Sequence, residues 1–278
     1  DGRIRSTLNQ TETRTGRISS TEPNLQNIPV RSPLGREMRK FFVARDGYVL
    51  VDADYSQIEL RVLAHISGDR NMIKAFNDNT DIHTVTASEV FDMPPQLVTP
   101  IMRSRAKAVN FGIVYGIGAF SLAKDIGVSR SEADEYIKGY LRHYSGVDKY
   151  MHDVVEKAKK DGYAETMFAR RRYLPELTAS NANTRAFGER VARNMPIQGT
   201  AADIIKIAMI RVYERLEREN LAAKLIMQVH DELIVEAPEN EKERVSALLK
   251  EEMENAVKLS VALTADVHSG RTWYDAKG

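Results

Sequence analysis

One stretch of sequence decides the fold: residues 48–66 read YVLVDADYSQIELRVLAHI. Its first part is a short apolar run rich in β-branched residues, which predicts a buried strand. Its second part predicts a helix, because apolar residues recur on one helical face. These apolar residues are Ile58, Leu60, Val62, Leu63 and Ile66. Asp54 therefore lies where a buried strand gives way to a helix.

A second carboxylate, Asp231, lies in a similar setting. Residues 225–229 are apolar except for Gln228, residues 233–235 are apolar, and the three residues between these runs predict a tight β-hairpin. A carboxylate beside a buried strand is costly unless it is paired or coordinates a cation. Mg²⁺ prefers a few carboxylates together with phosphates and water. For either aspartate alone, however, a capping role in a helix or a turn is the commoner explanation.

The composition limits the class of protein without deciding its function. The 278 residues can form one large domain or two modest ones, and shares of 42% hydrophobic and 28% charged residues are typical of a soluble globular protein. No apolar run reaches the roughly 18–20 residues of a membrane span, and no secretory signal is evident. The absence of cysteine excludes disulfides and thiolate metal sites. With a net charge of +1, any phosphate-binding surface must come from local clustering.

The chain begins with a polar segment. Residues 3–30 are rich in Arg, Ser, Thr, Asn and Gly, with strand-like pieces at 3–11 and 16–20. Residues 21–29 are interpreted as an ordinary solvated loop, although polar residues at this density also suit a surface that meets a polar partner. Because the chain lacks an initiator Met and starts in strand-like sequence, we expect it to be a piece of a longer protein.

The remaining segments predict a mixed α+β fold, with strands towards both ends and helices between them. Pro196 and Gly199 are expected to separate two helices at residues 184–195 and 200–219. The other expected elements are helical pieces within 69–100, a hairpin at 163–177 that carries three arginines, a helix at 239–258 and a strand at 261–267.

Residues 126–142 contain a possible helix-turn-helix. Ser129 and Glu132 form a capping box that opens a helix carrying Tyr136, Ile137 and Tyr140. One alternative function is therefore a regulator that binds duplex DNA sequence-specifically. Most such patterns are only two packed helices.

Residues 101–115 predict a basic amphipathic helix. Arg103, Lys107, Phe111 and Tyr115 recur at steps of four, and each step turns a helical position by about 40°. Two cations followed by two aromatic rings would suit the phosphates and the base of a nucleoside triphosphate. A buried aromatic stripe with solvated basic ends fits the same spacing, and the periodicity leaves both open.

Two further polar groupings are candidates for binding. Arg190, Asn194 and Gln198 also recur at steps of four, and such a face can read the edges of a nucleic-acid groove. His230 beside Asp231 could be a metal ligand or a general acid, but a lone histidine is usually neither.

Three segments together resemble the catalytic motifs of family A DNA polymerases, the bacterial DNA polymerase I group. The first is DYSQIELR at residues 54–61, the second is R-x3-K-x3-F-x3-Y-G over residues 103–116, and the third is VHDE at residues 229–232. Residues 15–20, 24–29 and 190–198 also resemble segments that contact DNA in this family. The resemblance covers essentially the whole chain, in order and with compatible spacing.

This resemblance implies the palm and fingers of a right-hand polymerase. The palm would be an antiparallel sheet with packed helices, formed by residues 1–68 and 183–278, and residues 69–182 would form largely helical fingers. Members of the family carry a thumb and an exonuclease-type domain ahead of the palm, and we expect neither in this chain. Because the thumb grips duplex product, its absence would weaken the hold on DNA.

The resemblance also implies a site for two Mg²⁺ ions, with Mn²⁺ as a substitute. Asp54, Asp231 and the backbone carbonyl of Tyr55 would bind them, roughly 3.5–4 Å apart as in other two-metal sites. One ion would lower the pKa of the primer 3′-hydroxyl, and the other would stabilise the departing pyrophosphate. Lys107 would neutralise phosphate charge and protonate the leaving group.

In the family pattern, Arg103 and His83 would hold the phosphates. Glu59 would close space against a 2′-hydroxyl, which separates this group from related single-subunit RNA polymerases. Phe111, in place of tyrosine, is expected to disfavour dideoxynucleotides, and Tyr115 would lie at the nascent base pair. The full set implied to bind the nucleotide is Gln57, Glu59, His83, Arg103, Lys107, Phe111 and Tyr115.

A second set of residues is implied to contact DNA. Arg17 and Gln198 would donate hydrogen bonds to minor-groove acceptors that all correct base pairs share, which checks geometry rather than sequence. The full set is Arg17, Asn24, Gln26, Asn27, Arg190, Asn194, Gln198, His230 and Glu232.

The expected function is template-directed DNA synthesis, with dNTPs added to a primer 3′-hydroxyl. The expected partners are primer–template DNA and dNTPs, with no membrane and no obligate protein partner, in the bacterial cytoplasm at the nucleoid. The alternative is a fragment that binds template–primer and dNTP with little turnover, because the thumb is missing.

Overall fold

The computed structural model describes residues 2–29 and 33–277, which divide into two compact units. The first unit contains the residues before Glu59 together with Ala201–Lys258 and the residues from Leu263 onwards. The second unit contains Glu59–Thr200 and Leu259–Ala262. The chain thus passes from the first unit to the second between residues 58 and 59, and it returns to the first unit between residues 200 and 201. The boundaries between palm and fingers expected at 68/69 and 182/183 stay a prediction. No helix in the described part of the chain is long and apolar enough to cross a membrane.

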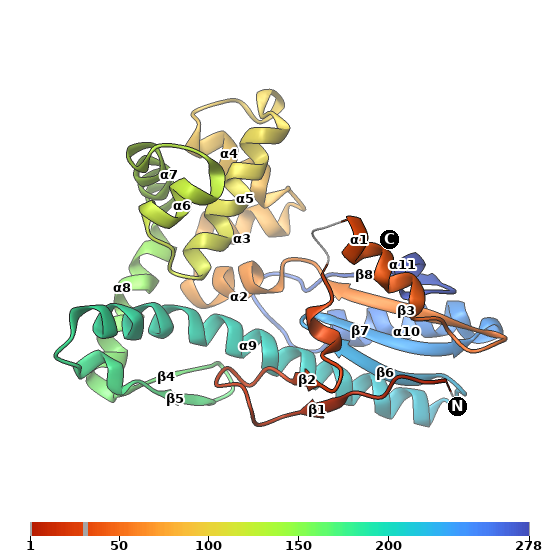
Figure 1. Ribbon diagram of the computed structural model, residues 1–278. Helices are drawn as coiled ribbons and strands as arrows, with labels where there is room; N and C mark the ends of the chain where they lie inside the picture. The colour runs from red at the N-terminus through yellow and green to blue at the C-terminus, as the bar shows by residue number, and fades with distance from the viewer. Residues whose placement is uncertain (1, 30–32, 278) are drawn as a thin grey trace. The chain divides into compact units, whose positions relative to one another are not determined.

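A four-stranded antiparallel sheet forms the centre of the first unit (Figure 1). Its strand order is β6-β7-β3-β8. The strands are β3 (Tyr48–Tyr55), β6 (Lys224–Val229), β7 (Glu232–Pro238) and β8 (Ala265–Gly270). The strand at residue 48 and the hairpin at Asp231 are therefore confirmed. The strand expected at 261–267 begins at Ala265 instead, because Ala265 pairs with Tyr55, the last residue of β3.

The two faces of β3 carry different side chains, because alternate residues of a strand point to opposite faces. Tyr55 faces α10 (Lys242–Glu254) and donates a buried hydrogen bond of 2.6 Å from its hydroxyl to the Met253 carbonyl. Leu50 packs on the other face against Trp273 of the short helix α11 (Trp273–Ala276). Asp52 and Asp54 share this second face with Leu50.

The N-terminal segment forms short elements that belong to the first unit. The strand-like pieces expected there pair as an antiparallel hairpin, with Leu8 opposite Ser20. The elements are β1 (Thr7–Asn9), β2 (Ser19–Thr21), η1 (Leu25–Asn27), α1 (Pro33–Glu37) and η2 (Met38–Phe41). Elsewhere in the first unit, the 3₁₀ turn η5 (Glu239–Glu241) precedes α10. The loop expected at residues 21–29 thus contains the 3₁₀ turn η1. Its Gln26 side chain donates to the Gln228 carbonyl of β6 at 3.2 Å.

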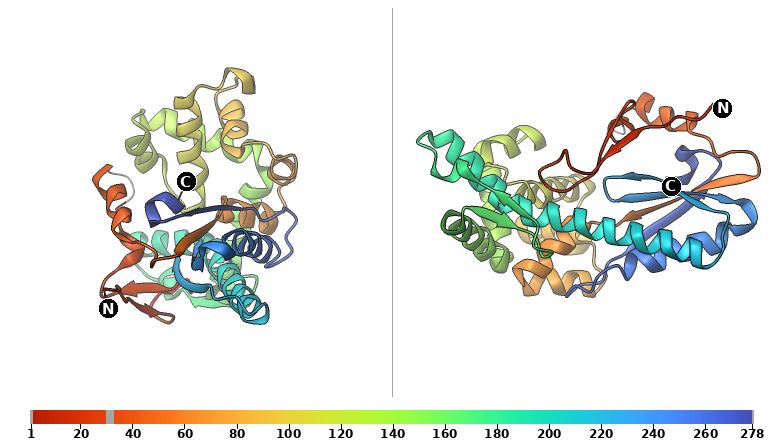
Figure 2. Two further views of the ribbon diagram at one scale, coloured as in Figure 1. Left: turned by 90° about the vertical axis from the view of Figure 1, so that its right-hand side faces the viewer. Right: turned by 90° about the horizontal axis from the view of Figure 1, so that it is seen from below.

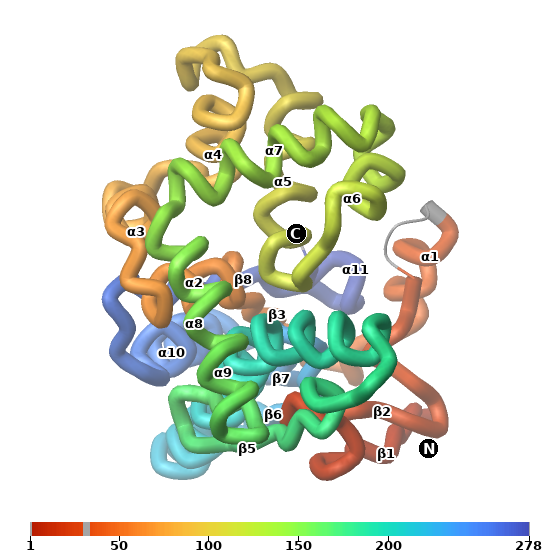
Figure 3. Tube along the Cα trace, turned by 90° about the vertical axis from the view of Figure 1, so that its left-hand side faces the viewer, coloured from red at the N-terminus to blue at the C-terminus, as the bar shows by residue number. Residues whose placement is uncertain are grey.

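The second unit is largely helical (Figure 3). Its helices are α2 (Ile58–Ser67), α3 (Arg70–Asn77), α4 (Ile82–Val90), η3 (Pro95–Leu97), α5 (Pro100–Val114), α6 (Ala119–Ile126), α7 (Arg130–His143), α8 (Ser145–Asp161) and η4 (Pro175–Thr178). The hairpin expected at 163–177 is confirmed as β4 (Tyr163–Glu165) and β5 (Arg171–Tyr173). The capping box of Ser129 and Glu132 is also confirmed, at the start of α7.

The two helices expected on either side of Pro196 are in fact one. Helix α9 runs without a break over Ala182–Arg218 with Pro196 inside it (Figure 2). A proline in a helix interior removes one hydrogen bond and costs about 3 kcal/mol. On either side of Pro196, Met195 and Ile197 are fully buried. Burial of the apolar face therefore outweighs the local preference of proline to end a helix.

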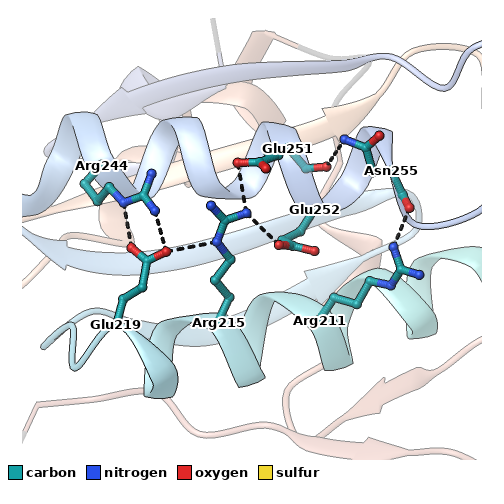
Figure 4. A network of polar contacts seen from close by, with 7 residues as sticks. All are labelled: Arg211, Arg215, Glu219, Arg244, Glu251, Glu252 and Asn255. Carbon is teal, nitrogen blue, oxygen red and sulfur yellow. Dashed lines mark hydrogen bonds and ion pairs between the residues drawn. The ribbon is translucent and has the colours of Figure 1, made fainter.

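A network of ion pairs and hydrogen bonds joins the last turns of α9 to α10 (Figure 4). At its centre, the guanidinium of Arg215 pairs with Glu219, Glu251 and Glu252 at 2.7 to 2.9 Å, and its side chain is 13% exposed. The network consists of Arg211, Arg215, Glu219, Arg244, Glu251, Glu252 and Asn255. Because α10 packs against β3, β7 and β8, these pairs also support the sheet.

Replacement of Arg215 by alanine should therefore destabilise the first unit. Three glutamates would lose their shared partner, and we expect Tm to fall by roughly 3–6 °C. Lys138→Ala removes a cation from the exposed Lys138–Asp134 pair of α7 and should leave Tm unchanged within error. Thermal unfolding followed by circular dichroism would measure both. Equal shifts for the two variants would contradict a supporting role for the network.

Candidate functional site

The pairing of β3 with β7 brings the first and third sequence motifs together. Asp54 lies directly opposite Glu232 in the antiparallel register. The backbone N–H of Tyr55 donates to the Asp231 carbonyl at 3.0 Å. Val229 and Glu232 are cross-strand partners, so His230 and Asp231 form a two-residue turn between β6 and β7. The two aspartates expected to bind metal therefore lie at the same end of the sheet.

The turn itself is held in an unusual backbone conformation. His230 has a φ of 52°, in the left-handed region that non-glycine residues rarely adopt. Gln228, which is buried, donates from its side chain to the His230 carbonyl at 2.6 Å. Gln26 also donates to the Gln228 side chain at 3.3 Å, so residues from η1 and β6 fix the turn. The His230 side chain remains exposed.

Two residues that the sequence did not suggest belong to this acidic site. The ammonium of Lys277 pairs with Asp54 at 2.9 Å and with Glu232. Burial lowers the pKa of Lys277, but the nearby carboxylates of Glu232, Asp52 and Asp54 outweigh burial and raise it. Asp52 is buried, and burial together with repulsion from Glu232 raises its pKa to about 7. The alternation of strand residues could have revealed Asp52, whereas nothing in the sequence links Lys277 to the site.

The carboxylates at this turn fit a hard divalent cation. Asp54 Oδ1 and Glu232 Oε1 are buried and accept no hydrogen bond from any described residue. Buried carboxylate oxygens of this kind need a cation or a donor. Within the described part of the chain, no group of three or more Asp, Glu or His side chains could hold an ion alone. A cation here would need oxygens from water or phosphate as well, which is the usual coordination of Mg²⁺.

A cavity of about 460 Å³ opens beside these carboxylates within the first unit. Its volume falls in the range of small-molecule sites. The lining residues are Leu25, Gln26, Ile28, Arg36, Arg39, Asp54, Val229, His230, Asp231, Glu232, Tyr274 and Lys277.

In the second unit, α5 presents the second motif on its exposed side. Arg103, Lys107 and Tyr115 are exposed, and Phe111 is half-buried with its ring 5.9 Å from the His83 ring. The buried side of the helix is formed instead by Ala106, Val109, Asn110, Ile113 and Val114. The stripe of two cations and two aromatic rings is therefore not a buried core stripe, and it is accessible to a ligand.

Arg103 is held by a carboxylate of the neighbouring helix α4. Its guanidinium makes two hydrogen bonds to Asp81, at 2.5 and 3.2 Å. Burial would raise the pKa of Asp81, but hydrogen bonds from Arg103, Thr84 and the His83 N–H lower it to about 2. Asp81 also caps the N-terminus of α4. Asp81 therefore holds the guanidinium of Arg103, the group expected to bind phosphate, in position before a ligand arrives.

His83 is buried and forms part of a polar chain between α4 and α5. Burial lowers its pKa to about 4. The negative charge of Asp81 raises this pKa, whereas the positive charges of Arg103 and Lys107 lower it. The Asn110 side-chain amide lies 3.0 Å from His83 Nδ1, and its carbonyl accepts from Thr86. This network assigns Nδ1 as the acceptor and leaves the proton of the neutral ring on Nε2.

The other candidate residues are spread over both units. In the first unit, Asn24 and Asn27 are exposed, Arg17 is half-buried, and the Asn24 side chain caps η1 by accepting from the Gln26 N–H. Gln57, also in the first unit, has a φ of 56° at the junction of β3 and α2.

In the second unit, Glu59 is buried in α2. Arg190 is exposed on α9, and Gln198 on the same helix is half-buried. Asn194 donates to the Val114 carbonyl at 3.2 Å and so caps the last turn of α5.

With this geometry in view, the comparisons identify the family. The family model of DNA polymerase family A matches residues 1–275. The chain therefore belongs to DNA polymerase family A, which confirms the resemblance of its three motifs.

The relatives are bacterial polymerases. DNA polymerase I of Caldicellulosiruptor bescii is 53% identical over 99% of this chain, and that of Bacillus subtilis is also 53% identical over 99%. The thermostable DNA polymerase I of Thermus thermophilus is 50% identical over the whole chain. The chain spans about a third of the length of these curated relatives, between 31% and 33%.

A solved structure supports the fold assignment. The POL domain of Pol1 from M. smegmatis, in complex with DNA primer-template and dNTP, superposes with a TM-score of 0.96 at 48% identity. The match covers all of this chain and 49% of that one. This confirms the predicted α+β fold of an antiparallel palm sheet with largely helical fingers.

The burial of His83 predicts how the stability of the folded state depends on pH. Because its folded-state pKa of about 4 lies below its ordinary value near 6.5, the folded state should lose stability as the pH falls from about 6.5 to 4. In an NMR titration, the His83 ring should stay neutral at pH 5.5 with its proton on Nε2. Replacement of Asp81 by asparagine removes a stabilising anion and should lower the pKa of His83 further. A titration midpoint near 6.5 would contradict the buried polar chain.

Proposed function

We propose that the protein is a template-directed DNA polymerase that adds dNTPs to a primer 3′-hydroxyl. The observation that carries the proposal is the register of β3 and β7, which brings the carboxylates of two sequence motifs to one end of the sheet. Membership of the family and relatives named DNA polymerase I support it. A close structural neighbour is described in complex with primer-template and dNTP, which supports the same substrates here.

Asp54 and Asp231 would hold two Mg²⁺ ions, together with the Tyr55 carbonyl. The site fits this role because it gathers carboxylates and because two of their buried oxygens, Asp54 Oδ1 and Glu232 Oε1, accept no hydrogen bond from any described residue. When bound, the ions would supply the positive charge that lowers the pKa of the primer 3′-hydroxyl and neutralises the leaving pyrophosphate. Mn²⁺ would substitute, because it takes the same oxygen ligands.

The exposed face of α5 would bind the triphosphate. Arg103 offers a planar guanidinium suited to two phosphate oxygens, and its pair with Asp81 keeps it in place before the substrate arrives. Lys107 would neutralise phosphate charge and donate a proton to the pyrophosphate. His83 would act as a neutral hydrogen-bond donor through Nε2, because burial prevents its protonation at neutral pH.

Selection of the sugar and the base pair would fall to three further positions. Glu59 is buried, so its side chain is held in one place, as steric exclusion of a 2′-hydroxyl requires. Phe111 and Tyr115 would contact the incoming nucleotide and the nascent pair, and Gln57 would complete this nucleotide-binding set.

The DNA contacts proposed for this protein are independent of base sequence. Arg17 and Gln198 would donate to the minor groove. The further contacts are proposed for Asn24, Gln26, Asn27, Arg190, Asn194, His230 and Glu232. A cytoplasmic, nucleoid-associated location follows from this function and is proposed with it.

Primer extension on a defined template tests the reaction class. Asp54→Asn or Asp231→Asn should lower the rate by roughly three orders of magnitude or more, because several kcal/mol of charge stabilisation depends on each carboxylate. Asp46→Asn, which alters a fully exposed carboxylate of the same unit, should extend primers normally. Near-normal extension by either site variant would rule out the proposed roles. Extension by the unaltered protein only at high enzyme concentration would instead favour a weak grip on DNA.

A second experiment tests the assignment of Glu59. Glu59→Ala should raise incorporation of rNTPs relative to dNTPs by roughly tenfold to a hundredfold, because the space beside the 2′ carbon opens. Glu59→Gln keeps the side-chain volume and should retain most of the discrimination. Relative kcat/KM for dNTP and rNTP measures both. If both variants discriminate as the unaltered protein does, Glu59 does not select the sugar.

A further inference from the structure

Arg39 on η2 carries a buried positive charge that has no ion-pair partner among the described residues. The residue is 8% exposed, and its guanidinium lies 4.4 Å from the centre of the Trp273 ring. Its side chain makes no hydrogen bond or ion pair with any residue that the structure describes, and Nε is fully buried without a partner. Burial of an unpaired cation is costly, and cations in such positions normally have an anionic partner.

Arg39 lines the same cavity as Asp54 and Asp231. Lys277 also lines this cavity, but its charge is already paired with Asp54 and Glu232. Arg36 is exposed to solvent, where a charge needs no partner. Arg39 therefore supplies the cavity with a buried positive charge that is available to an anionic ligand.

The residues that line the cavity are complementary to the chemical groups of one nucleotide. Leu25, Ile28 and Val229 are apolar and suit a sugar or a base face, and Gln26 adds a polar group. The carboxylates suit a cation-bound hydroxyl, and Arg39 suits a phosphate. The volume of about 460 Å³ is enough for a group of this size.

We propose that Arg39 binds the phosphodiester that joins the 3′-terminal nucleotide of the primer to its neighbour, with that nucleotide seated in the cavity. The inference rests on the proposed function and adds a phosphate contact to it. The contact with the Trp273 ring restrains the guanidinium, and its terminal N–H groups would donate to the two non-bridging oxygens. The bound phosphodiester would also remove the cost of the unpaired charge.

The test compares primers that differ by one charge. One primer has a normal phosphodiester at its last linkage, another has a neutral methylphosphonate there, and a third has the methylphosphonate several nucleotides upstream. Dissociation constants for each primer–template are measured by fluorescence anisotropy with the unaltered protein, Arg39→Met and Arg39→Lys, and primer extension is measured in parallel. Arg39→Met keeps an unbranched apolar stem beside Trp273 and removes the charge.

The unaltered protein should bind the terminal methylphosphonate primer roughly tenfold to a hundredfold more weakly than the normal primer, as loss of a charged hydrogen bond implies. Arg39→Met should bind the normal primer and the terminal methylphosphonate primer equally weakly, because the charge of the last linkage no longer contributes to affinity. Arg39→Lys should recover part of the difference. The Tm of free Arg39→Met should be equal to or above that of the unaltered protein, because an unpaired buried charge is removed.

Lys40→Met provides the matched control. Lys40 follows Arg39 on η2, but it is exposed and pairs with Glu37, so this variant should still distinguish the two terminal linkages. The inference is overturned if Arg39→Met still distinguishes them, and a lower Tm in that variant would then assign Arg39 a structural role beside Trp273. Failure of the unaltered protein to extend any primer would instead overturn the proposed function itself.

Discussion

The antiparallel pairing of β3 with β7 places Asp54 opposite Glu232 and ties the Tyr55 N–H to the Asp231 carbonyl. A slip of one residue in this register would turn every side chain of β3 to the opposite face of the sheet. The buried residues Val51 and Ala53 on one face and Leu50 on the other prevent such a slip. The packing of the palm sheet and the position of the acidic site are therefore fixed by the same interaction.

Charge is distributed unevenly in both units, and the imbalance has a physical cost. Carboxylates gathered at one hairpin turn repel one another, and the structure moderates this through the ammonium of Lys277 and the raised pKa of Asp52. In the second unit, Asp81 holds the guanidinium of Arg103 in advance of a ligand. Unsatisfied or strained groups are common at functional sites, where the ligand completes the interactions. The left-handed turn residue His230 belongs to the same pattern.

Much of the fold could be predicted from local patterns in the sequence. Apolar runs gave the strand at residue 48 and the hairpin around Asp231, and Ser129 with Glu132 marked the start of a helix. The continuity of α9 through Pro196 could not be predicted, because it depends on burial by residues distant in the chain. For the same reason no sequence pattern pointed to Lys277, which is 223 residues from its partner Asp54. The spacing of the motifs identified the family, whereas the structure was needed to show that the buried charge of Arg39 has no ion-pair partner within residues 2–29 and 33–277.

The central claim is that the carboxylates of Asp54 and Asp231 together bind the divalent ions used in nucleotide addition. It is tested most directly by crystals of the protein grown with primer–template, a non-hydrolysable dNTP and Mn²⁺, measured at the manganese absorption edge. The account predicts two anomalous peaks coordinated by carboxylate oxygens of both aspartates. A complex with ordered DNA and nucleotide but no manganese at these carboxylates would contradict it.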